Sequence, residues 1–321
     1  MREVIASAPS KVNVCLYVGA PEPDGYHPLV TVFEALNLRE KVTVRTSRTP
    51  GIHVRTTAYF PDGSIDHPTT RIFTEMDPRT HLAWRAAKLM QKLAMATPWA
   101  QTAAGVSIQV DKYVPVAGGM AGGSADAAAT LIACQKLWDL PLQEKQLHAI
   151  ARSLGADVPA CLVGGLSLGT GRGDHMHVLS NQVPARHWVL ALSDRGLSTP
   201  EVFRELDAGG GPLGKWQPLP TKDPEHYMFF ADESEKIAPH IHNDLSEAAC
   251  RLRPELTETM RSARQAGALA AFLSGSGPTI AALARDEKHA LQIARTWEQS
   301  PYVQRTICAH GPAQGARLES L

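Results

Sequence analysis

The sequence has few cysteines, no excess of charge of either sign and no long hydrophobic run. Its five cysteines are far apart and form no Cys-x-x-Cys pair, which argues against a disulfide framework and a zinc knuckle. Lysine plus arginine equals aspartate plus glutamate, 32 each, so no overall field favours nucleic acid or an anionic membrane. No run reaches the roughly 18 apolar residues that a membrane span needs. We therefore predict a cytoplasmic protein with no nucleic-acid or membrane partner, which binds any anionic ligand locally.

The composition is that of an ordinary globular protein. Hydrophobic residues make up 44% of the chain and charged residues 20%, which supplies enough apolar side chains for a sizeable core. The length of 321 residues is long for one core, so we expect two domains. The first residues, "MREVIASAPSKVNVCLYVGA", alternate apolar and polar positions, which indicates a strand and not a signal peptide.

Predicted strands and helices alternate along the chain. Residues 1–57 contain several alternating runs typical of strands, whereas residues 58–79 show no period and are predicted to form an irregular loop. The segment "THLAWRAAKLMQKLA" has helical apolar spacing, with Thr80 as its predicted cap. Strands and helices after about residue 180, interrupted by a Gly/Pro-rich loop at 208–224, predict an α+β second domain.

The most distinctive segment is "VPVAGGMAGGSADAAATLIA", residues 114–133, in which glycines lead into an alanine-rich helix. The first N–H groups of a helix lack intrahelical partners, and the macrodipole places partial positive charge there. Glycine lets this backbone approach phosphate oxygens, so the segment predicts a phosphate site. Its spacing fits neither the Walker A nor the GxGxxG pattern. A flexible loop before a buried helix is the alternative; Ser124 favours the phosphate site, because its hydroxyl can cap the helix or face a Mg²⁺-phosphate.

Three ordered motifs resemble those of the GHMP kinases: "APSKVNVCLYV", then "PVAGGMAGGSA", then "LSGSGPTIAAL". This resemblance implies a two-domain α+β fold, with an ATP-binding domain like ribosomal protein S5 over residues 1–180 and a ferredoxin-like domain over residues 181–321. It implies ATP and Mg²⁺ as cofactors, with Ser124 as the protein's contact to the metal. The residues that it assigns to ATP are Pro115, Val116, Ala117, Gly118, Gly119, Met120, Ala121, Gly122, Gly123, Ser124 and Ala125.

Further segments resemble one branch of this family, which phosphorylates the 2-hydroxyl of 4-diphosphocytidyl-2-C-methyl-D-erythritol in isoprenoid precursor synthesis. They are "PDGYHPLVTVFEAL", "LGADVPACLVGG" and "NDL" at 243–245. The resemblance therefore implies a small-molecule substrate and a monomer or homodimer. The chain departs from the family pattern twice. Ala125 replaces the second serine of the glycine loop, and His81 replaces the asparagine that usually opens the earlier helix, "THLAWRAAKLMQKLA". The second departure leaves any adenine contact at His81 unassigned.

The resemblance places the catalytic roles on Asp157 and Lys11. A carboxylate within hydrogen-bond reach of a hydroxyl can accept its proton as the new bond forms, and a lysine beside it would meet the developing negative charge. For Asp157 the alternative is a plain helix cap, and for Lys11 it is a solvated strand lysine. Strand alternation predicts Lys11, Asn13 and Cys15 on one face, with the intervening residues on the buried face.

The resemblance also implies contacts to the substrate. Tyr26 and His27 lie in a Pro/Asp/Gly turn that we expect to be exposed, and they would hold the cytosine by stacking and hydrogen bonding. Asn13 is a further expected contact. Phe203 would be the opposing aromatic, although a helical phenylalanine is more often a core residue.

A second glycine turn, "SGSGPT" at 274–279, would lie over the phosphate site with Gly275, Ser276 and Gly277 nearest the ligands. The alternative is a simple tight hairpin. Two His-x-His pairs, at 175–177 and 240–242, have no third ligand at suitable spacing, so we do not predict a zinc site.

Two other functions compete with this interpretation. A GHMP kinase acting on homoserine or mevalonate would lack a use for the "PDGYH" element. A silent nucleotide-binding member of the family would not need both Lys11 and Asp157.

Overall fold

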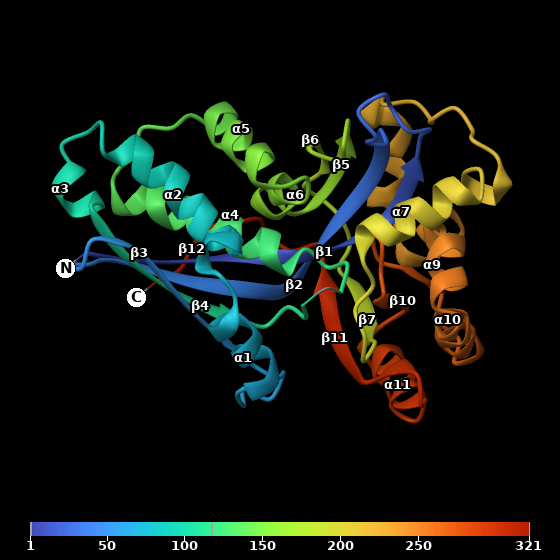
Figure 1. The fold of residues 1–321 in the computed structure, drawn as a ribbon. Helices are drawn as coiled ribbons and strands as arrows, with labels where there is room; N and C mark the ends of the chain where they lie inside the picture. Colours follow the sequence, from blue (N-terminus) through green and yellow to red (C-terminus); the bar gives the residue numbers. More distant parts are fainter. Residues whose placement is uncertain (1, 117, 321) are drawn as a thin grey trace.

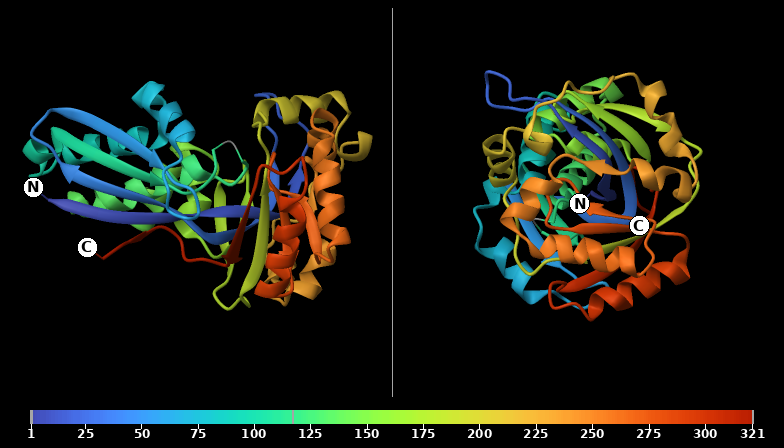
Figure 2. Two further views of the ribbon diagram at one scale, coloured as in Figure 1. Left: turned by 90° about the horizontal axis from the view of Figure 1, so that it is seen from below. Right: turned by 90° about the vertical axis from the view of Figure 1, so that its right-hand side faces the viewer.

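A computed structural model describes residues 2–116 and 118–320 and shows two units, each built on its own β-sheet (Figure 1). The N- and C-termini lie at the same end of the molecule, far from the second unit (Figure 2). There the backbone N–H of Glu319 donates to the carbonyl of Ile5 at 2.9 Å.

The first unit contains, within the described residues, an eight-stranded sheet centred on two long antiparallel strands. These are β1 (Glu3–Val18) and β2 (Leu29–Thr46). Strand β4 pairs antiparallel with β2, and β3 pairs parallel with β4. The remaining strands extend from β1 and β2. Their bounds are β3 (Gly51–Ala58), β4 (Gly105–Lys112), β5 (Leu166–Thr170), β6 (His175–Ser180), β8 (His242–Asn243) and β12 (Arg317–Leu318).

Helices α2, α5 and α6 of the first unit pack against α4 (Gly122–Leu137). This helix lies between α2 and the strands β1 and β2. Its alanines are fully buried, and their small volume lets the helix approach its neighbours closely. The other helices are α1 (His67–Glu75), η1 (Pro78–Thr80), α2 (Leu82–Ala94), α3 (Ala100–Ala103), α5 (Glu144–Leu154) and α6 (Val158–Val163).

The second unit has, in the described chain, a four-stranded antiparallel sheet in the order β11-β7-β10-β9. Helices α10 and α11 pack on this sheet, which gives the βαββαβ succession of a ferredoxin-like fold. Its elements are β7 (Arg186–Leu192), α10 (Glu255–Gln265), β9 (Ala270–Leu273), β10 (Ile280–Ala284), α11 (Glu287–Glu298) and β11 (Arg305–Gly311). The connecting helices are α7 (Thr199–Ala208), η2 (Pro212–Gly214), η3 (Pro224–Ala231), α8 (Ser234–Ile237), η4 (Ala238–His240) and α9 (Ser246–Leu252). The α+β prediction is confirmed.

A buried ion pair joins the two units. The guanidinium of Arg186, on β7, pairs with the carboxylate of Glu34, on β2, and both side chains are fully buried. The indole of Trp188 donates to the same carboxylate at 2.8 Å. A buried charge pair is costly to break when only one partner is removed, so these contacts fix β7 against β2.

A single boundary residue does not fully separate the two domains. The sheets change between β6 and β7, but β8 and β12 return from the later part of the chain to pair with β1. We propose domains of residues 1–180 and 181–321, with these two short strands crossing back.

The prediction of an irregular loop at 58–79 is wrong. Helix α1 occupies part of this segment, with Asp66 as its cap and Pro68 in its first turn. The helix has only nine residues, and none of them is buried, so it is too short for an apolar period to be recognised in the sequence.

The predicted cap of the following helix is also wrong. His81 is the N-cap of α2, and its Nδ1 accepts a hydrogen bond from the backbone N–H of Ala83 at 3.1 Å. Thr80 instead ends the short helix η1. An imidazole nitrogen can replace the usual hydroxyl or carboxylate oxygen as the acceptor at a helix start.

None of the helices in residues 2–116 and 118–320 is long and apolar enough to cross a membrane.

Candidate active site

The glycine-rich segment connects β4 to the start of α4. Ala121 is the N-cap in a left-handed conformation, with φ of 62°, and Gly122 is the first helical residue. A side chain at Gly122 would meet Val114 and Glu40 at about 3.1–3.2 Å. The loop therefore fits closely over the sheet, and it presents the N–H groups of a 16-residue helix, the arrangement that binds anions.

The second glycine turn lies directly against this loop. A Cβ on Gly119 would lie 2.2 Å from the carbonyl oxygen of Ser274, so only glycine allows this approach. The hydroxyl of Ser274 donates to the carbonyl of Gly119 at 3.3 Å. A Cβ on Gly275 would lie 3.2 Å from the same carbonyl. Two turns that are 155 positions apart in the chain thus form one wall of the site.

A cavity of about 840 Å³ opens between these turns, β1 and α6. Its size is within the range of small-molecule sites. Predicted site residues that line it are Lys11, Asn13, Tyr26, His27, Gly119, Ser124, Asp157, Phe203, Gly275 and Ser276. Two other residues of the glycine loop, Met120 and Ala125, are buried in the core, and Gly277 shapes the second turn with a φ of 80°. Ala117 lies outside the described residues.

Lys11 is buried in the cavity, where its ammonium group lies among three oxygen acceptors. Its Nζ donates to the side-chain oxygen of Asn13 at 2.7 Å and to the carbonyl of Gly119 at 3.1 Å. The carboxylate of Asp157 is 3.4 Å away. Asn13 is held in turn by the hydroxyl of Thr31, to which its amide donates at 2.9 Å. This network places one buried positive charge between the glycine loop and the carboxylate.

Asp157 occupies the N-cap position of α6, but its carboxylate does not cap the helix. Within the described chain the side chain makes no cap hydrogen bond. The carboxylate is 38% exposed and faces Lys11 and the cavity. It is therefore free to accept a proton from a ligand.

Strand alternation around Lys11 holds only as far as Asn13. A β-bulge between Asn13 and Cys15 inserts Val14 as an extra residue opposite β2. Such a bulge reverses the faces beyond it, so Leu16 lines the cavity while Cys15 is in the core. The prediction that Cys15 shares the face of Lys11 is wrong.

The turn that carries Tyr26 and His27 is only partly exposed. Tyr26 is 56% exposed, whereas His27 is buried, at 7%. The His27 ring lies 5.0 Å from Phe203 and 5.4 Å from Trp216, and its Nδ1 is 2.8 Å from the carbonyl of Gly19. Because a carbonyl can only accept, Nδ1 carries a proton. The expectation that both residues are exposed is wrong for His27, which Trp216 helps to cover.

Comparisons with known proteins identify the family. The models for the N-terminal and C-terminal domains of GHMP kinases match residues 81–165 and 233–304. A 4-diphosphocytidyl-2-C-methyl-D-erythritol kinase of Cutibacterium acnes is 42% identical, over 96% of this chain and 94% of that protein. One of Mycolicibacterium gilvum is 41% identical, over 98% and 92%. The crystal structure of a 4-(cytidine 5'-diphospho)-2C-methyl-D-erythritol kinase has a TM-score of 0.70 at 29% identity, covering 96% of this chain and 98% of that one.

The chain belongs to the GHMP kinases, in the group of 4-diphosphocytidyl-2-C-methyl-D-erythritol kinases. The predicted resemblance is thereby confirmed.

In this GHMP kinase, His81 has a structural role. Burial lowers its pKa, which favours the neutral form of the ring. While Nδ1 caps α2, Nε2 lies 3.1 Å from the hydroxyl of Thr56. Both ring nitrogens are engaged within the protein, which leaves neither for a ligand.

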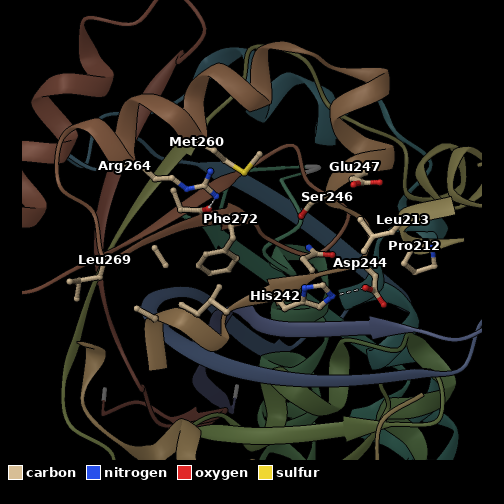
Figure 3. Close-up of a pocket in the computed structure, with 15 residues that line it drawn as sticks. Pro212, Leu213, His242, Asp244, Ser246, Glu247, Met260, Arg264, Leu269 and Phe272 are labelled. Carbon is tan, nitrogen blue, oxygen red and sulfur yellow. Dashed lines mark hydrogen bonds and ion pairs between the residues drawn. The ribbon is translucent and has the colours of Figure 1, made fainter. Parts of the chain in front are cut away.

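The second glycine turn of the kinase is anchored from behind by Asn243, in the "NDL" segment. Its amide donates to the carbonyls of Leu273 at 2.8 Å and Gly275 at 2.7 Å. Behind this segment lies a second cavity, of about 430 Å³, into which His242, Asp244 and Arg264 project (Figure 3). His242 pairs with Asp244 at 2.6 Å. Asn243 therefore lines this second cavity and holds Gly275, which lines the active-site cavity.

A buried ion triad supports the phosphate loop, and the sequence did not indicate it. Lys112, at the end of β4, donates to Glu40 on β2 at 2.6 Å and to Asp126 in α4 at 2.9 Å. The second carboxylate oxygen of Glu40 accepts from the N–H of Tyr113 at 2.7 Å. These contacts tie the sheet, the loop and the helix together. The available signal in the sequence was Lys112 itself, a lysine at the end of an alternating strand just before the glycines.

Replacing Glu40 by glutamine is expected to flatten the pH dependence of stability. Burial raises the pKa of Glu40 to about 8. The charge of Asp126 also raises this pKa, whereas the charge of Lys112 lowers it. The folded protein therefore keeps a proton that the unfolded chain releases, and the free energy of unfolding falls as pH rises from about 4.5 to about 8. Urea unfolding across this window measures the effect. Identical slopes for the wild type and Glu40→Gln would contradict it.

Several charged residues at the cavity were also not predicted. Arg152 and Arg172 line it, together with Asp174. Arg172 and Asp174 belong to the glycine-rich turn "GTGRGDH" between β5 and β6. Charged side chains in such a turn were a usable signal, because loops held by rigid strands often carry binding residues.

Proposed function

We propose that this chain transfers the γ-phosphoryl group of ATP to the 2-hydroxyl of 4-diphosphocytidyl-2-C-methyl-D-erythritol, giving the 2-phosphate and ADP in isoprenoid precursor synthesis. The observation that carries the proposal is the pairing of Lys11 with Asp157 at 3.4 Å. This pair lies in a cavity that reaches from Gly119 of the glycine loop to Tyr26 and Phe203. The names of the relatives that match almost the whole chain support the choice of acceptor.

The chemistry needs a base for the acceptor and a positive charge for the transferring group. Asp157 accepts the proton of the 2-hydroxyl as the hydroxyl oxygen forms a bond to the γ-phosphorus. The bond from that phosphorus to the bridging oxygen breaks, and ADP leaves with the electron pair. Lys11, oriented by Asn13 and Gly119, stabilises the negative charge that spreads over the phosphoryl oxygens.

The glycine loop and the start of α4 would hold the ATP phosphates through backbone N–H groups. We propose that Mg²⁺ arrives with ATP and that the hydroxyl of Ser124, a residue that lines the cavity, contributes to its binding. Among the residues that the structure describes, no cluster of three or more His, Cys, Asp or Glu side chains could hold a metal. The Mg²⁺ ligands would then be mostly phosphate oxygens and water, which Mg²⁺ commonly retains.

The cytidine half of the substrate would bind at the other end of the cavity. The exposed ring of Tyr26 offers a stacking surface, and Phe203 lines the cavity beside His27. Stacking on an aromatic face contributes ~1–3 kcal/mol per base in single-strand binding. The oligomeric state, monomer or homodimer, stays a prediction from the sequence. The same holds for the cytoplasmic location.

Comparison of three acceptors tests the proposed function. With Mg²⁺-ATP, we expect ADP release with 4-diphosphocytidyl-2-C-methyl-D-erythritol and only background release with mevalonate or homoserine. The reason is that Tyr26, His27 and Phe203 have no nucleobase to bind in the two smaller alcohols. Coupled measurement of ADP gives the rates. Turnover of mevalonate or homoserine alone would refute the proposal, and no turnover of any acceptor would favour a silent member of the family.

A further inference from the structure

Two turns meet at the mouth of the cavity, beside Tyr26. One joins β1 to β2 and carries Asp24 and Tyr26; the other joins β5 to β6 and carries Arg172. The N–H of Leu29 donates to the carbonyl of Gly171 at 2.7 Å, which holds the turns together. The guanidinium carbon of Arg172 lies 3.7 Å from the centre of the Tyr26 ring. Arg172 therefore covers one face of the ring that is proposed to stack on cytosine.

Asp24 fixes both members of this stack. One of its carboxylate oxygens accepts from Nη2 of Arg172 at 2.5 Å. The other accepts from the backbone N–H of Tyr26 at 3.0 Å. On the opposite turn, the backbone N–H of Arg172 donates to Asp174 at 3.2 Å. The backbone of Tyr26 and the guanidinium above its ring are thus tied to the same carboxylate.

We infer that Arg172 is a positioning residue for cytidine recognition: stacked on one face of Tyr26 and held by Asp24, it orders the ring so that the opposite face receives the base. This inference rests on the proposed function. Tyr26 is 56% exposed, and a free aromatic side chain at the surface loses rotamer freedom when a ligand binds. A planar guanidinium stacks on an aromatic ring and removes part of that freedom beforehand.

The geometry favours this role over direct binding of the substrate's diphosphate. The charge of Arg172 already has a partner in Asp24, and its guanidinium lies over the ring. The effect of Arg172 should therefore reach the substrate through Tyr26. A lysine at this position would keep the charge but lose the planar stack.

A double-mutant cycle on cytidine binding tests the inference. Arg172→Ala should weaken binding of cytidine, measured by calorimetry, by roughly three- to tenfold, the range expected for ordering one side chain. In the background of Tyr26→Ala, the same substitution should change cytidine affinity by less than about twofold, because coupled residues are not additive. Arg172→Lys should resemble Arg172→Ala. Cytidine diphosphate should show the same loss as cytidine.

Steady-state kinetics supply a readout that a general structural defect would not give. Arg172→Ala should raise KM for the cytidyl substrate while kcat and KM for ATP stay unchanged. Arg261→Ala is the matched control, since Arg261 forms an exposed ion pair with Glu258 on α10, and it should change none of these values.

Several results would overturn the inference. They are equal effects of Arg172→Ala with and without Tyr26, rescue by lysine, or a loss of affinity for cytidine diphosphate without a loss for cytidine. Rescue by lysine would show that the charge of Arg172 matters and not its planar stack, and a loss confined to cytidine diphosphate would show that Arg172 binds phosphate. Because cytidine binding needs no turnover, it separates failure of this inference from failure of the proposed reaction, which the wild-type assay with the complete substrate decides.

Discussion

Asp157→Asn is expected to lower kcat by about 10²–10⁴-fold, the usual contribution of a positioned base. The amide has nearly the same shape as the carboxylate but cannot accept the proton of the attacking hydroxyl. The Asp157 side chain makes no cap hydrogen bond to α6 in the described structure, so any change in melting temperature should come from the lost ion pair with Lys11. Initial rates of ADP release at saturating substrate measure the effect.

Asp286→Asn provides a matched control for this variant. Asp286 is also a helix-cap aspartate, at the start of α11, but its side chain accepts from the N–H of His289 and it does not line the cavity. Asparagine is as good a cap as aspartate, so this variant should keep a normal kcat. Near-normal turnover of Asp157→Asn would remove Asp157 from the role of base.

Lys112→Met is expected to lower the free energy of unfolding by about 3–5 kcal/mol, the cost of leaving a buried charge without its partner. Lys112 is 3% exposed and is the cation that both Glu40 and Asp126 contact. Its loss leaves the buried acidic side chains of Glu40 and Asp126 without a cation beneath the glycine loop. Urea unfolding followed by tryptophan fluorescence measures the change.

Lys41→Met is the control, because Lys41 is an exposed lysine on the neighbouring strand β2. Substitutions at such surface positions usually change stability by less than about 0.5 kcal/mol. Adding Glu40→Gln and Asp126→Asn to Lys112→Met should recover part of the lost stability, since no buried charge then remains. If Lys112→Met alone costs less than about 1 kcal/mol, the triad does not support the loop.

The sequence was most informative where a local pattern carries the chemistry. The glycines before α4 predict an anion-binding helix start from backbone properties alone, and the structure forms a helix there. Lys11 and Asp157 were paired through the resemblance to a family, and not by their spacing of 146 positions. Their roles stay proposals.

The features that sequence patterns missed depend on contacts between distant segments. Arg172 and Asp24 are 148 positions apart, and Lys112 and Glu40 are 72 apart. No local period encodes such pairs. The burial of His27 likewise requires Trp216 from another segment, and the bulge after Asn13 is seen only when β1 is paired with β2.

The position of the phosphate in the product tests the central claim most directly. The purified chain would be incubated with Mg²⁺-ATP and 4-diphosphocytidyl-2-C-methyl-D-erythritol, and the product examined by ¹³C and ³¹P NMR. The proposed reaction predicts a new phosphomonoester whose phosphorus couples to the carbon that bears the methyl branch, and this signal should be absent with Asp157→Asn over the same time. A phosphate on any other carbon, or no phosphate transfer by the wild type, would contradict the proposed function.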